Sequence, residues 1–156
     1  MMQNTHFNFQ IKKGSIEDVV TVSNQIPELE NPHAKEVYKT RMNGKKHLIL
    51  IAYLEKEMIG FKVGYDKFED GKNFYTWMGG ILPAFRKKGI AAMLAKKQET
   101  WIKQNGFQNV ILKTRNKHQG MLIFAIKNNF KIIEIEPKEN INEHRILLKK
   151  ELNVER

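Results

Sequence analysis

The sequence predicts a mixed α/β fold from two observations. Segments whose apolar residues alternate every second position, as in half-buried strands, are interleaved with segments whose apolar residues recur at helical spacing. Their order is β-α-α-β-β-β-α-β-α-β-β. The chain has 156 residues, of which 41% are hydrophobic, and this size suits one compact core. We therefore expect a single domain over residues 1–156.

The first half of the chain supplies one strand, two helices and then a run of three strands. Phe7, Phe9 and Ile11 alternate and predict the first strand. Ser15, followed three residues later by Asp18, has the pattern of a capping box that opens a helix. The predicted elements are a strand over 6–14, helices over 15–26 and 33–43, and three antiparallel strands within 47–82.

The second half continues with two helices and three strands. Ile90, Met93, Leu94 and Trp101 share one face of a predicted helix, so we expect this helix to pack on the sheet. The predicted elements are a helix over 89–105, a strand over 109–115, a helix over 117–128, and strands over 130–137 and 144–152. We expect the last residues, 153–156, to be loose.

The composition narrows the classes of function. The chain carries 27 lysine and arginine residues against 17 acidic ones, a formal net charge of +10. This charge favours an anionic partner, such as nucleic acid, an acidic surface or a phosphorylated small molecule. Because there is no cysteine, a disulfide framework, a thiolate metal site and a cysteine nucleophile are excluded. The five histidines lack metal-ligand spacing, so we assign no metal.

Several familiar sequence signals are missing. No apolar run is long enough to cross a bilayer, and the N-terminal residues lack the features of a signal peptide, so we expect a cytoplasmic protein with no membrane contact. Neither the phosphate-binding loop of nucleoside triphosphatases nor the dinucleotide fingerprint occurs. The two serines, Ser15 and Ser23, do not lie in a nucleophile elbow.

The stretch GGILPAFRKKGIAAMLAKKQE, residues 79–99, joins a strand to a helix through a basic loop. Three cations at 86–88 come directly before Gly89, where the helix starts, so they meet the positive end of the helix dipole. This arrangement is unfavourable unless an anion binds there. Gly89 and Ala91 leave backbone amides uncovered for phosphate oxygens. We therefore predict phosphate binding by this loop, with a merely solvated loop as the alternative.

Residues 86–91, Arg-Lys-Lys-Gly-Ile-Ala, resemble motif A of the GNAT superfamily of N-acetyltransferases, whose signature is Gln/Arg-x-x-Gly-x-Gly/Ala. The family places this motif between its fourth strand and third helix, which is the position predicted here. The stretch NKHQGMLIFAIKNNFKI, residues 116–132, is similar to the family's motif B, with Asn129 and Phe130 at the start of the sixth strand. The resemblance covers nearly the whole chain.

The resemblance implies a central, mostly antiparallel mixed sheet of six to seven strands flanked by about four helices. It implies an N-acetyltransferase that moves the acetyl group of its co-substrate, acetyl-CoA, to a primary amine. The diphosphate would bind at the basic loop, and the pantetheine arm would pair with the backbone of the fourth strand, where a bulge is the alternative. The residues implied to bind the co-substrate are Gly80, Ile81, Leu82, Arg86, Lys87, Lys88, Gly89, Ile90, Ala91, Asn116 and Phe124.

Two departures from the family pattern concern the chemistry. The tyrosine that protonates the departing thiolate in many members falls here at Ala125. The asparagine often found twelve residues before Phe130 falls at His118, and the nearest asparagine is Asn116. The usual acid is therefore missing. The role of the family's asparagine is assigned to Asn116 because it is the nearest asparagine in the sequence.

The predicted mechanism is direct attack by the amine in a ternary complex, without an acyl-enzyme. The absence of cysteine removes the most plausible covalent carrier. An N–H group near Ile81 would polarise the thioester carbonyl. Tyr75 is the candidate proton donor because it shares a strand face with Gly79 and Ile81, where some family members carry a glutamate base. A packed aromatic ring is the alternative interpretation of Tyr75.

A basic nucleic-acid-binding module without catalysis is the alternative function. Residues 86–103 hold six lysines and arginines against one glutamate. Nucleic-acid binding would favour aromatic residues among exposed cations, whereas the aromatic residues here occupy strand-periodic positions. For the acetyltransferase, the acceptor stays open among a polyamine, an amino acid, an aminoglycoside, and a protein N-terminus or lysine. A homodimer is also left open.

Overall fold

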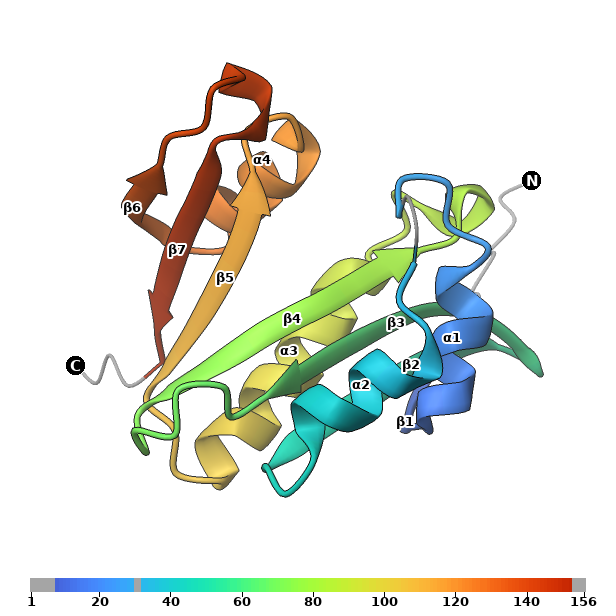
Figure 1. The fold of residues 1–156 in the computed structure, drawn as a ribbon. Coiled ribbons are helices and arrows are strands. Elements are labelled where there is room, and N and C mark those ends of the chain that lie inside the picture. Colours follow the sequence, from blue (N-terminus) through green and yellow to red (C-terminus); the bar gives the residue numbers. More distant parts are fainter. Residues whose placement is uncertain (1–7, 30–31, 153–156) are drawn as a thin grey trace, which may run out of the picture. The chain divides into compact units, whose positions relative to one another are not determined.

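The computed structural model describes residues 8–29 and 32–152 (Figure 1). Its helices are α1 (Ile16–Ser23), α2 (Lys35–Met42), α3 (Ile90–Gln104) and α4 (Gln119–Lys127), with short 3-10 turns at Pro83–Phe85 and Ile141–Glu143. Its strands are β1 (Phe9–Lys13), β2 (His47–Leu54), β3 (Glu57–Tyr65), β4 (Asn73–Ile81), β5 (Asn109–Arg115), β6 (Lys131–Glu136) and β7 (Arg145–Glu151). The predicted order of helices and strands is confirmed. Phe7 and residues 153–156, for which predictions were made, lie outside the described residues.

The strands form a seven-stranded sheet in the order β1-β2-β3-β4-β5-β7-β6. β1 is antiparallel to β2, and β7 is antiparallel to both β5 and β6. β4 and β5 are parallel, and their register runs from Asn73 opposite Asn109 to Thr76 opposite Leu112. The predicted mixed, mostly antiparallel sheet is confirmed. Among the described residues, no helix combines the length and the apolar content needed to cross a membrane.

The chain divides into two compact units. The first unit comprises the described residues up to Val63 together with Met78–Gln98. The second comprises Gly64–Trp77 and the described residues from Glu99 onward. β3, β4 and α3 each contribute residues to both units.

Helix α1 begins where the sequence predicts but ends earlier. The Ser15 amide donates to the Asp18 carboxylate (3.0 Å), and the Asp18 amide donates to the Ser15 hydroxyl (3.1 Å), which completes the capping box. The helix ends at Ser23 instead of the predicted residue 26. Pro27 disfavours helical geometry at Ile26, and the chain leaves the helix in a tighter turn, in which the Gln25 amide donates to the Val22 carbonyl (3.0 Å) and the Ile26 amide donates to the Ser23 carbonyl (3.2 Å).

The first unit has its core between β2 and the two N-terminal helices, which lie side by side in Figure 1. Ile51 and Ala52 of β2, Val19 and Val22 of α1, and Tyr38 of α2 are all fully buried. A continuous apolar run in β2 is typical of a strand that is covered on both faces. This packing stabilises α1 and α2, which are only two turns long and would not hold alone.

In the second unit, alternate strand residues divide between a core face and an opposite face. The core contains Val110 and Leu112 of β5 and Ile146 and Leu148 of β7, packed with Ala125 of α4. Because successive side chains of a strand point to opposite faces, the residues between these core positions lie on the other side of the sheet. That second face carries most of the charge discussed below.

Helix α3 buries a stripe with four-residue spacing. Ile90 and Leu94 are each 2% exposed, which confirms the predicted packed face for these two residues. The prediction is wrong for Met93, which is 40% exposed. The stripe continues through buried Gln98 and Ile102, so Met93 lies at its edge.

Candidate functional site

The loop between β4 and α3 has a backbone suited to an anion. Lys87 and Gly89 both have positive φ, of 62° and 84°. A Cβ added at Gly89 would meet no atom within 4 Å, so the space beside the backbone is open. The amides of Ile90 and Ala91 open α3 and find no backbone acceptor among the described residues. Such free amides, aligned with the helix dipole, attract negative charge.

The Arg86 side chain is engaged within the first unit. Its guanidinium donates to both carboxylate oxygens of Glu28, at 2.7 Å each, and its Nε donates to the Ile81 carbonyl at 3.0 Å. The hydrogen bond from Arg86 lowers the pKa of Glu28 to about 2. These contacts fix the loop to the end of β4 and to the segment after α1. The exposed side chains of Lys87 and Lys88 follow directly in the loop.

The end of β4 presents one backbone edge to β3. The Leu82 amide donates to the Ile59 carbonyl of β3 at 2.8 Å. Because N–H groups alternate in direction along a strand, the Ile81 amide points to the opposite edge. A Cβ at Gly80 would lie 2.7 Å from the Ile26 side chain. A side chain at position 80 would therefore require the end of the Ile26 side chain to move.

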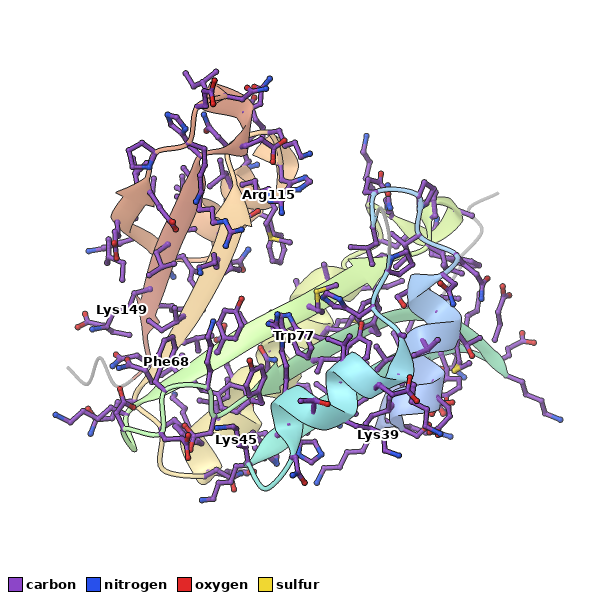
Figure 2. All side chains as sticks on the ribbon, viewed as in Figure 1. Lys39, Lys45, Phe68, Trp77, Arg115 and Lys149 are labelled. Carbon is purple, nitrogen blue, oxygen red and sulfur yellow. The ribbon has the colours of Figure 1, made fainter. Side chains whose placement is uncertain are left out.

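Tyr75 lies in the second unit within an aromatic cluster. It is 6% exposed, and its ring makes edge contacts with Tyr65 (5.8 Å between centroids) and Phe68 (6.2 Å). Lys67 places its Nζ 4.6 Å from the centre of the Tyr75 ring. Figure 2 labels Phe68 and Trp77, and Trp77 also packs against Tyr65. Packing accounts for the Tyr75 ring, and proton donation by its hydroxyl stays a prediction.

The motif B residues occupy separate positions in the second unit. The Asn116 side-chain amide donates to the Ile141 carbonyl at 3.2 Å. Phe124 is half-buried on α4. Ala125, at the position of the family's tyrosine, is fully buried in the core of this unit. Alanine has no ionisable group, so this position does not supply an acid.

The sequence reasoning missed Glu28 and three charged residues of the second unit. Glu28 is 58 residues away from Arg86, and nothing in its local sequence marks it as a partner. Lys113, Glu134 and Arg145 line a pocket described below. Strand alternation was the available signal for Lys113 and Arg145, which are next to the core residues Leu112 and Ile146. Glu134 lies between two exposed isoleucines, so this signal does not mark it.

Residues 16–130 match the model of a family described as the acetyltransferase (GNAT) family. No curated protein matches the chain.

Several solved structures share the fold. The ribosomal-protein-S18-alanine N-acetyltransferase from Escherichia coli has a TM-score of 0.78 at 10% identity, covering 95% of this chain and 96% of that chain. The aminoglycoside 6'-N-acetyltransferase from Enterococcus faecium has a TM-score of 0.77 at 15% identity, covering 94% and 99%. A GNAT family acetyltransferase from Elizabethkingia anophelis with acetyl-CoA bound has a TM-score of 0.70 at 22% identity, covering 92% and 98%. At these identities the likeness establishes the fold alone.

Proposed function

This chain belongs to the GNAT acetyltransferase family, and on that premise we propose that it transfers the acetyl group of acetyl-CoA to a primary amine. The observation that carries the proposal is the loop before α3. Its positive φ angles, the open space at Gly89 and its exposed cations are what a diphosphate site requires. Acetyl-CoA would supply the reactive thioester, and the chain would supply binding, orientation and polarisation.

The residues of this loop fit a diphosphate in distinct ways. The amides of Ile90 and Ala91 would bind phosphate oxygens, which the missing side chain of Gly89 lets approach. Lys87 and Lys88 would balance the phosphate charge. Because Glu28 and the Ile81 carbonyl engage Arg86, we assign Arg86 to shaping the loop.

The edge of β4 would bind the pantetheine arm through the backbone of Gly80, Ile81 and Leu82. The Leu82 amide is already bonded to β3, so Ile81 is the better donor among the three. Its amide would polarise the thioester carbonyl, a contact that is commonly worth about 3 kcal/mol. Asn116 and Phe124, which lie in the second unit, are assigned to co-substrate binding by the family resemblance alone.

The proposed reaction is direct attack by a neutral amine in a ternary complex. The chain contains no cysteine to carry an acyl group, and its two serines lie at α1, away from the loop in sequence. Tyr75 is proposed to supply a proton from β4, since the core position of Ala125 offers none. Initial rates measured with both substrates varied test this mechanism. Double-reciprocal plots should give intersecting lines for a ternary complex, and parallel lines would indicate an acyl-enzyme.

The acceptor is proposed only as a primary amine. The names of two structural neighbours give different acceptors, a ribosomal-protein alanine and an aminoglycoside, so this fold does not select one. We propose that residues 1–156 act as one cytoplasmic N-acetyltransferase domain, because the family match includes residues of both units. Loops at 28–45, 66–73 and 136–144 are proposed to shape the acceptor wall.

Two measurements test the proposal. Calorimetry with CoA and acetyl-CoA should give saturable binding, and thiol release over an amine panel should identify acceptors. A salt titration separates the nucleic-acid alternative, which the comparisons do not support: duplex binding falls steeply with salt, whereas CoA binding also depends on the uncharged pantetheine arm. Absence of both CoA binding and thiol release would overturn the proposed function.

A further inference from the structure

The second unit contains a pocket of about 150 Å³. The proposed function assigns a chemical role to one of its lining residues, Tyr75, and Lys67, Phe68 and Glu136 belong to the loops proposed to shape the wall of the acceptor site. The pocket lies on the sheet face opposite the core of this unit. Its apolar lining comes from Ile111 of β5 and Leu147 of β7, with Tyr75 and Phe68 as an aromatic wall. Phe68 is labelled in Figure 2. Ligand sites are usually larger than this pocket, so it suits a small molecule.

The strand register places opposite charges on the two sides of Leu147. Lys113 of β5 is opposite Leu147 in one ladder, and Glu134 of β6 is opposite Leu147 in the next. Neighbouring strands are about 4.8 Å apart, so the backbones of Lys113 and Glu134 are separated by about 10 Å. Both long side chains line the pocket. One small molecule lying over Leu147 therefore has a cation on one side and an anion on the other.

One acidic residue of the pocket is already paired within the protein. Glu136 accepts a hydrogen bond from Lys138 at 2.9 Å. After the larger effect of Lys138, the charges of Arg145 and Lys113 also lower the pKa of Glu136. The side chains of Lys113 and Glu134 themselves make no hydrogen bond or ion pair with any residue that the structure describes.

We propose that this pocket binds a small zwitterion of the amino-acid type. Its ammonium group binds the Glu134 carboxylate, its carboxylate binds Lys113, and its apolar part lies on Leu147 and Ile111. A simple amine would leave Lys113 without a counter-charge, and a simple carboxylate would leave Glu134 without one, so each binds more weakly. The proposal concerns binding only and holds whether or not the ligand is acetylated.

The test compares three ligands of one shape by NMR titration of the full chain without CoA. L-leucine carries both charges, 3-methylbutylamine lacks the carboxylate, and 4-methylpentanoate lacks the ammonium group. We expect L-leucine to bind at least about tenfold more tightly than either analogue, since each analogue loses one charge-assisted contact. Equal affinities, or no saturable binding of L-leucine, would overturn the proposal.

Matched variants locate the site. Lys113→Gln and Glu134→Gln should each weaken L-leucine binding by about tenfold or more. Lys127→Gln on α4 and Glu57→Gln on β3 remove exposed charges outside the pocket and should leave L-leucine affinity unchanged. Thermal unfolding of each variant checks that the fold is retained. Unchanged affinity in both pocket variants would overturn the proposal, and CoA calorimetry on the same samples keeps the proposed function separately testable.

Discussion

The basic loop before α3 and the mixed-charge pocket of the second unit are built in opposite ways. The loop places its cations and amides within six consecutive residues, Arg86 to Ala91. The pocket takes its charged residues from the β3–β4 connection, β5, β6 and β7, between Lys67 and Arg145. A site is therefore visible in a sequence when residues that are neighbours in space are also neighbours in the chain.

The two regions also differ in the ligand that their charges fit. The loop presents free amides and exposed lysines, while its acidic partner Glu28 is occupied by Arg86. A dianion such as a diphosphate suits it. In the pocket, a cation and an anion, Lys113 and Glu134, lie on either side of an apolar residue. Substitutions that affect one region and spare the other test this contrast.

The largest expected effect comes from Gly89→Glu. A carboxylate at this position would occupy the open space and repel the diphosphate, so CoA affinity should fall by about a hundredfold or more. Gly106→Glu is the matched control, because Gly106 also has positive φ (87°) and open space at its Cβ position. Calorimetry should show normal CoA affinity for that control. Normal CoA affinity of the Gly89→Glu variant would show that this loop is not the diphosphate-binding site.

Tyr75→Phe tests the residue that belongs to the pocket and is also the proposed proton donor. The ring packing is kept, so the melting temperature should not change, but kcat should fall by about tenfold or more if the hydroxyl delivers a proton. Tyr65→Phe removes a hydroxyl from the adjacent ring and should leave kcat unaltered. Equal kcat values in both variants would exclude proton donation by the Tyr75 hydroxyl and would show that its ring only packs.

Gln98→Met tests whether an unpaired buried amide on α3 lowers the stability of the protein. Gln98 is 1% exposed, and its Nε2 finds no hydrogen-bond partner in the described part of the chain. Leaving such a group buried costs about 1 kcal/mol or more, so the variant should raise the free energy of unfolding by about 1 kcal/mol. Gln104→Met, at an exposed position of the same helix, is the control. Urea denaturation measures both variants, and a loss of stability in Gln98→Met would contradict the prediction.

The smallest expected effect concerns the ion pair between Glu28 and Arg86. The hydrogen bond from Arg86 lowers the pKa of Glu28 from 4.5 to about 2. The pair therefore contributes its full stabilisation above pH 4.5 and loses it as the pH falls toward 2. Both side chains are partly exposed, so Glu28→Gln should cost less than about 1 kcal/mol at pH 6.

Denaturation curves at several pH values check this expectation. The stability difference between wild type and Glu28→Gln should shrink steadily from pH 4.5 to pH 2, and Glu57→Gln, at an exposed position of β3, provides the control. A difference that does not depend on pH would contradict the ion pair as the cause.

The element order, the capping box of α1 and the loop before α3 could all be predicted from the sequence. Each depends on residues that lie within a few positions of one another, such as Ser15 with Asp18. Element ends were less predictable, because the three-residue error at the end of α1 reflects a competition between helix propagation and the restriction imposed by Pro27.

The order of helices and strands, the glycine that opens the loop and the basic character of that loop follow from the sequence alone. The folded structure is needed to see that Glu28 engages Arg86, that Ala125 lies in the core, and that Lys113 and Glu134 flank Leu147. The two groups differ in the distance along the chain over which the interactions act. Helical spacing and capping follow from bonds along the backbone, whereas ion pairs, burial and strand register follow from which distant segments pack together, and no local pattern records that choice.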